Sequence, residues 1–319
     1  MKLSELVNYR CQLDAMFADP IGQTADKEIE KIIYLTKNQN IQIANFAQQL
    51  HQRRIDIQKS FDLFESDLAA LKLELKNLIE ITEKPWFAES YRLYDQEMQN
   101  ETVEDIKNRT VTNISKDTKN FYLARISKYN SWKHAAIAIR PGFEPYLDHM
   151  VGCDPLYVVD VKHELLLPSL SRYNEIYQQR LRSYVVSERE QTEILHSLPN
   201  DQFGFIFAYN FFNFRPFEII RRYLVEAYKK LQPGGIMVMT FNDCDRDKAV
   251  MLVEQHFCCY TPGYLVLDLV KSIGFEPVLN WNDGGPSTWL ELKKPGEFTS
   301  LRGGQALAKI LPKPVAESK

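Results

Sequence analysis

The residues best placed to do chemistry follow two short apolar runs. The first run, 135–139, is followed by Arg140-Pro141-Gly142, and the second, 156–159, is followed by Asp160. The carboxyl ends of adjacent parallel strands lie together at one edge of an open α/β sheet, where nucleotide-like ligands bind. A carboxylate can accept hydrogen bonds from the hydroxyl groups of such a ligand. The spacing therefore predicts a ligand site formed by this turn and Asp160.

From Trp132 onward, short apolar runs alternate with helical segments, and these elements must position the turn and the acid. Further strands are expected at 183–186, 201–209, 236–241, 276–279 and 288–292, with helices at 165–182, 217–231 and 264–272. Such alternation is typical of a mostly parallel sheet covered by helices on both faces. The predicted fold class is therefore α/β, a doubly wound sheet preceded by a long α-helical region.

The N-terminal region carries the repeat of a coiled coil. Between Ile29 and Leu78, apolar positions recur at alternating steps of four and three residues, and no glycine or proline interrupts 24–84. A sustained 3.5-residue period keeps one stripe of a helix facing a partner. We expect a homodimer or homotrimer through Ile29–Leu78, although pairing with another helix of the same chain also satisfies the pattern. The helix is expected to stop at Pro85.

The register of this repeat assigns particular side chains to the seam. Asn40 and Arg54 fall at a positions, where asparagine favours one register at a cost in stability. The d positions are Ile29, Ile43, Leu50, Ile57, Phe64, Leu71 and Leu78.

Composition excludes several classes of function. With 319 residues, 45% of them hydrophobic, the chain can bury a substantial core, and its formal net charge of -3 gives no overall attraction to nucleic acid or to an anionic membrane. No apolar segment has the length of a signal peptide or a membrane span, so a cytoplasmic protein is expected. The five cysteines and the scattered histidines lack the spacing of metal ligands. No metal site is predicted.

Three later motifs together resemble the class I S-adenosylmethionine-dependent methyltransferases. LPNDQF at 198–203 precedes the fourth expected strand, LQPGGI at 231–236 leads into the fifth, and SIGFEPV at 272–278 precedes the end of the sheet. The resemblance covers residues 131–294, roughly half of the chain. It implies a Rossmann-like fold, S-adenosylmethionine as cofactor, and methyl transfer to an acceptor that the sequence does not identify.

The resemblance also implies roles for individual residues. Asp160 falls where the family binds the ribose hydroxyls, and Ser187 where it contacts adenine. Pro141 and Gly142 would shape the turn beneath the cofactor, and Asn210 would lie near the methionine amine or the acceptor. Asp160 and Ser187 could instead cap the loops that they begin. No catalytic acid or base is identified.

The opening turn departs from the family pattern. Ala138, Arg140 and Glu144 stand where the family has an acid and two glycines, and Gly142 alone remains. Bare backbone is needed there because the cofactor passes directly over it. Arg140 must therefore block the cofactor or swing out to a carboxylate, such as Asp160 or Glu144. The alternative function is a catalytically inactive head on a coiled-coil stalk, acting in assembly or as an adaptor with a protein partner.

The chain is accordingly predicted to have four parts. These are a helical oligomerisation region at 1–84, a connector at 85–130, a methyltransferase-like domain at 131–294 and a C-terminal extension at 295–319. A helix is expected near 117–129 within the connector, against the first strand of the domain.

Overall fold

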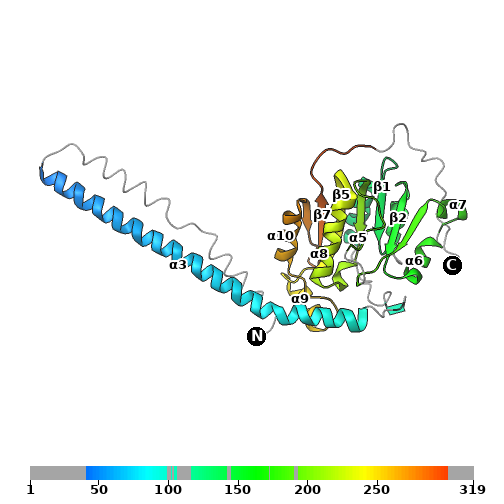
Figure 1. Cartoon of the computed structure of the whole chain (residues 1–319), viewed down its shortest axis with the longest axis horizontal. Coiled ribbons are helices and arrows are strands. Elements are labelled where there is room, and N and C mark those ends of the chain that lie inside the picture. Colours follow the sequence, from blue (N-terminus) through cyan, green and yellow to red (C-terminus); the bar gives the residue numbers. More distant parts are fainter. Residues whose placement is uncertain are drawn as a thin grey trace. The chain divides into compact units, whose positions relative to one another are not determined.

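The computed structural model describes residues 41–98, 102, 104–105, 116–141, 145–171, 173–189 and 193–300. The chain divides into two compact units, Met1–Pro85 and Trp86–Lys319. Helix α3 (Ile41–Leu93) begins in the first unit and ends in the second, and the strands all belong to the second (Figure 1). Within the described residues, none of the helices is both long and apolar enough to cross a membrane.

The expectation that the long helix stops at Pro85 is wrong, because α3 continues to Leu93. A proline inside a helix removes one backbone hydrogen bond. The turns that follow Pro85 are held by packing, since Ser90 and Leu93 are buried. The Ser90 hydroxyl also donates to the carbonyl of Trp86 at 2.9 Å. Burial of these turns therefore outweighs the missing bond. The seam positions Ile29, Asn40, Ile43, Leu50 and Arg54 lie outside the residues whose side chains are described.

The second unit is built on a seven-stranded sheet in the order β3-β2-β1-β4-β5-β7-β6 (Figure 1). The strands are β1 (Ala135–Ile139), β2 (Leu156–Asp160), β3 (Leu181–Val185), β4 (Phe203–Ala208), β5 (Leu231–Asn242), β6 (Glu276–Trp281) and β7 (Ser287–Lys293). Strand β7 is antiparallel to both of its neighbours, whereas the other pairs are parallel. The strand order reverses between β1 and β4, which is the switch point of a doubly wound sheet.

Helices flank this sheet along its length. They are α5 (Lys116–Tyr129), α6 (His163–Leu170), α7 (Glu175–Gln178), α8 (Phe217–Lys230), α9 (Asp247–Glu254) and α10 (Gly263–Ile273). Helix α6 contacts β2 and β3, α5 contacts β4, α8 contacts β5, and α10 contacts α8 and β6. The predicted Rossmann-like α/β fold is confirmed.

One helical prediction is wrong in detail. A single helix over 165–182 is expected, but the structure has α6 and α7 there. The side chain of Asn174 accepts a hydrogen bond from the backbone N–H of Tyr177 at 2.9 Å, so a new helix starts at this cap.

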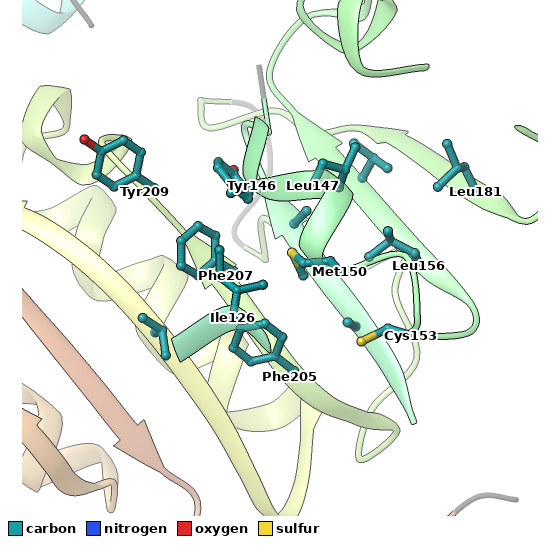
Figure 2. Close-up of a cluster of buried hydrophobic side chains, with 14 of the residues drawn as sticks. Ile126, Tyr146, Leu147, Met150, Cys153, Leu156, Leu181, Phe205, Phe207 and Tyr209 are labelled. Atoms are coloured by element: carbon teal, nitrogen blue, oxygen red, sulfur yellow. The ribbon is translucent and has the colours of Figure 1, made fainter. Parts of the chain in front are cut away.

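The core beside the switch point includes residues from α5 as well as from the strands. Figure 2 shows Ile126 of α5 beside Phe205 and Phe207 of β4. Tyr122, one turn before Ile126, is also fully buried and stacks on Tyr209 with ring centroids 5.3 Å apart. Helix α5 is thus part of the hydrophobic core of the second unit.

Candidate functional site

Four neighbouring strands bring most of the predicted site residues to one edge of the sheet. Arg140 and Pro141 follow β1, Asp160 ends β2, Ser187 follows β3 and Asn210 follows β4. These strands are mutually parallel, so their carboxyl ends lie side by side. The edge is the crevice at which open α/β sheets bind ligands. Gly142 and Glu144 lie outside the described residues.

Asp160 is engaged by Arg140. The guanidinium donates to Oδ1 of Asp160 from Nε at 3.3 Å and from Nη2 at 3.2 Å. The backbone N–H of Val161 donates to the same oxygen at 2.7 Å. The other oxygen, Oδ2, is buried and makes no hydrogen bond within the part of the chain that the structure describes. One carboxylate oxygen is saturated and the other has no donor.

The backbone of Arg140 is held in an unusual conformation. Its φ is +46°, in the left-handed region that a long side chain rarely adopts. The N–H of Arg140 donates to the carbonyl of Val159 at 2.7 Å. The hydroxyl of Tyr146 lies 3.1 Å from the carbonyl oxygen of Ile139 and 3.0 Å from that of Arg140. Strained conformations persist where their surroundings fix them, often at functional sites. The turn is therefore built to direct the Arg140 side chain towards Asp160.

A second buried ion pair lies beside the first. Arg215 donates from Nε to Oε1 of Glu188 at 2.9 Å, and the hydroxyl of Tyr94 donates to Oε2. The guanidinium carbon of Arg215 is 4.3 Å from the ring centroid of Phe211, and that of Arg140 is 5.0 Å from it. Such distances favour cation–π attraction. We call Arg140, Asp160, Glu188 and Arg215 the ion-pair network; Phe211 lies against both arginines.

Two cations and two anions make the ion-pair network neutral overall. Burial raises the pKa of Glu188, but the attraction of Arg215 and the hydrogen bonds from Tyr94 and Arg215 outweigh it and hold this pKa below its ordinary value. Burial lowers the pKa of Arg215, yet the charge of Glu188 overcomes it and the pKa is raised. Burial, followed by the negative charge of Glu188, raises the pKa of the nearby Tyr223. Glu188 and Arg215 are therefore both charged at neutral pH.

The remaining predicted residues lie at the same edge without joining the ion-pair network. The N–H of Asn210 donates to Thr240 Oγ1 at 2.8 Å, and its side-chain oxygen accepts from Asn213 at 2.9 Å. Asn210 has φ +50°, which asparagine tolerates better than most residues. Pro141 is buried, and Ser187 is half-buried next to Glu188. The edge thus carries amide and hydroxyl groups on its β4 side.

Sequence reasoning did not identify Arg215 or Tyr94. Arg215 had a weak signal, since it is the one charged residue in the apolar stretch 211–217. Tyr94 had none, because it lies far from Glu188 along the chain and meets it only through the fold.

A cavity of about 300 Å³ lies further along the same edge, beyond β5. Its lining includes Phe241, Asp243, Asp245, Arg246 and Gly263. Asp243 is engaged by Thr288, and Asp245 accepts from the N–H of Tyr264 at the start of α10. These hydrogen bonds give Asp243 and Asp245 a structural role. Among the described residues, no group of three or more histidine, cysteine, aspartate or glutamate side chains could hold a metal ion.

The solved structures that are similar to this chain include several methyltransferases. An O-methyltransferase family protein from Burkholderia thailandensis is 12% identical with a TM-score of 0.43, over 57% of this chain and 59% of its own. The N-methyltransferase NodS from Bradyrhizobium japonicum WM9, in complex with S-adenosyl-L-homocysteine, is 13% identical with a TM-score of 0.43. The match covers 59% of this chain and 91% of NodS. Phosphoethanolamine N-methyltransferase 2 from Haemonchus contortus, in complex with S-adenosyl-L-methionine, is 13% identical with a TM-score of 0.47. The match covers 64% of this chain and 60% of that protein.

The chain thus spans less than two thirds of the first and third of these proteins. No protein-family model matches the sequence. No curated protein matches it either. The fold is assigned from the strand order and register described above.

Proposed function

We propose that the second unit is a methyltransferase that uses S-adenosylmethionine, with Asp160 as the acceptor of a ribose hydroxyl. Three observations support the proposal: the position of Asp160 beside the switch point, the three sequence motifs, and the buried Oδ2 atom that lacks a donor. The last of these carries it, because a buried carboxylate oxygen without a donor is costly and a ligand hydroxyl would satisfy it.

In this proposal Arg140 stays on Asp160 and acts as a positioning residue. Arg140 and the Val161 N–H fix Oδ1, so the carboxylate presents Oδ2 alone. Asp160 then accepts from a single hydroxyl, whereas two free oxygens could serve both. Pro141, Gly142 and Ser187 would line the cofactor, and Asn210 would face the methionine part or the acceptor.

When bound, the cofactor would supply an activated methyl group: the acceptor's lone pair would form the new bond while the carbon–sulfur electron pair returned to sulfur, leaving S-adenosylhomocysteine. The contribution of the chain is placement of the acceptor in line with that bond. An acceptor that carries a proton on its attacking atom would have to lose it, and no side chain at this edge is assigned to remove it.

Calorimetry with S-adenosylhomocysteine tests the proposal. We expect saturable binding to the full chain that is lost in Asp160→Ala and weakened at least tenfold in Asp160→Asn, whose amide is a poorer match for a hydroxyl donor. Asp268→Asn, at an exposed position on α10, serves as the matched control and should bind like the unmodified protein. Absence of binding to the unmodified chain at millimolar ligand would overturn the proposal.

A second candidate function is favoured by the ion-pair network itself. Arg140 and Arg215 neutralise the two acids that a nucleoside would approach, so the fold satisfies most of its site without a ligand. In this alternative the domain is a catalytically inactive head that acts in assembly or as an adaptor. The calorimetric experiment decides between the two, because the inactive head binds no S-adenosylhomocysteine.

We also propose that α3 pairs with α3 of a second or third copy of this chain. Four d positions of the predicted heptads are exposed, namely Ile57 (40%), Phe64 (50%), Leu71 (45%) and Leu78 (50%). They repeat every seven residues, so identical copies place the same residues opposite one another in a parallel arrangement. Light scattering should give at least twice the mass of one chain, and a monomer would refute the pairing.

A cytoplasmic location remains a prediction.

A further inference from the structure

The last turns of α3 and the π-helical turn that follows, Tyr94–Met98, are bound to the loops of the carboxyl edge. Ser90 Oγ accepts from the N–H of Tyr260 at 2.7 Å, and the thiol of Cys259 donates to the Ser90 carbonyl at 3.8 Å. The rings of Phe87 and Tyr260 meet edge to face with centroids 5.2 Å apart. These contacts fix the segment on the loop that follows α9.

At the end of this segment, Tyr94 reaches the ion-pair network. Tyr94 is buried and its hydroxyl donates to Oε2 of Glu188, while Oε1 is taken by Arg215. The guanidinium carbon of Arg215 also lies 5.6 Å from the centroid of the Tyr94 ring. Both oxygens of Glu188 therefore already accept hydrogen bonds from the chain.

Among the described residues, the side chains around Asp160 are closely packed. Asp160 is 1% exposed, Arg215 is 1% exposed, and the Phe211 ring between Arg140 and Arg215 is fully buried. A nucleoside-sized ligand needs a cavity of about 300 Å³ or more, so part of this packing must move before one enters. The strands themselves are tied together by sheet hydrogen bonds. Among the described residues, segment 86–98 contributes Tyr94 to this packing from outside the sheet and its connections.

We propose that residues 86–98 form a latch, a segment that closes the ligand site. The hydrogen bond between Tyr94 and Glu188 holds this segment in its closed position. While the latch is closed, Tyr94 holds Glu188 on Arg215, and Arg215 in turn packs against Phe211 beneath Arg140. Release of Tyr94 lets the segment lift and gives a nucleoside access to Asp160. The inference rests on the proposed ligand site, but its first readout does not depend on any ligand.

Thiol labelling of the full chain, with the sites identified by mass spectrometry, provides that readout. Cys259 is fully buried against Ser90 of the latch, whereas Cys153 is buried elsewhere, beside Asn130. Tyr94→Phe removes the hydroxyl of this hydrogen bond to Glu188 and keeps the ring. We expect Cys259 to be labelled roughly tenfold faster in this variant, the effect of losing one hydrogen bond to a charged group, with Cys153 unchanged.

Tyr91→Phe, one turn earlier and exposed, is the matched control and should leave Cys259 labelling as it is in the unmodified chain. Unchanged labelling of Cys259 in Tyr94→Phe would overturn the latch, as would equal acceleration at Cys153, which indicates general loosening.

The second readout is the affinity for S-adenosylhomocysteine, which should rise roughly tenfold in Tyr94→Phe because less of the binding free energy is spent on opening. A lower affinity would show that Tyr94 belongs to the bound site and would overturn the latch as an inhibitory device. If Cys259 labelling accelerates while neither protein binds S-adenosylhomocysteine, the latch stands and the proposed cofactor function fails.

Discussion

Arg140 donates to a single oxygen of Asp160, with Nε and Nη2 at 3.3 and 3.2 Å from Oδ1, and leaves the other oxygen of this buried carboxylate without a donor. A bidentate pair would instead engage both oxygens. The arrangement satisfies the charge of Asp160 but not its full hydrogen-bonding capacity. It therefore accounts both for a stable fold without a ligand and for a remaining acceptor that a ligand could use.

The Arg140–Asp160 pair should reveal itself in stability. Asp160→Ala leaves a buried guanidinium without its carboxylate and should lower the free energy of unfolding by about 3–5 kcal/mol. The double variant Arg140→Met with Asp160→Leu removes both charges and should recover much of this loss. Urea unfolding followed by circular dichroism measures both. A double variant no more stable than Asp160→Ala would contradict the pair as the source of the effect.

Glu188 should make the protein sensitive to acid. Its pKa in the folded chain is lower than in the unfolded chain, so its stabilisation is complete above an unfolded pKa of about 4.3 and is lost as the pH falls through the lower folded pKa. Glu188→Gln should lower the unfolding free energy at pH 7 and make the decline below pH 4 shallower. Glu193→Gln, at an exposed position, should change the profile far less. Parallel profiles for Glu188→Gln and the unmodified chain would refute this role.

Cys153 should be chemically inert in the native protein. Burial raises the pKa of its thiol to about 12, so at pH 8 only about one thiol in 10⁴ is ionised. Iodoacetamide at pH 8 should leave Cys153 unmodified until urea unfolds the chain. Modification under native conditions would show that this part of the core opens.

Helix α5 should contribute to the stability of the second unit. Ile126→Ala removes a fully buried side chain from the core and should cost about 2–5 kcal/mol. Lys119→Ala, on the exposed face of the same helix, should change stability by less than about 0.5 kcal/mol. Thermal or urea unfolding of the full chain measures the stability of both variants. Equal effects would mean that α5 does not belong to this core.

Pairing through α3 makes a prediction that depends on position along one helix face. Leu71→Glu places a charge in the proposed seam and should give a monomer by light scattering. Leu73→Glu, at a more exposed f position away from the seam, should leave the assembly intact. If both variants behave alike, the exposed stripe is not the contact surface.

Much of the fold could be predicted because the central strands β1, β2 and β4 are short apolar runs whose identity is decided locally. The site could be predicted only in part. Arg140 follows one such strand and Asp160 ends another, and the arginine in place of a glycine left two alternatives, a blocked cofactor site or an ion pair with a carboxylate such as Asp160 or Glu144. Tyr94 and Arg215 act through contacts between distant segments, which no local pattern records. The continuation of α3 through Pro85 was missed for the same reason, since packing on loops far along the chain stabilises those turns.

The neutrality of the ion-pair network has a consequence for the speed of binding. Because the closed edge presents two positive and two negative buried charges, it exerts little long-range pull on a charged ligand. Association should then be nearly independent of ionic strength, and its observed rate should level off at high ligand concentration, where opening becomes the slow step. Stopped-flow measurements at two salt concentrations would separate this gated behaviour from diffusion-controlled capture.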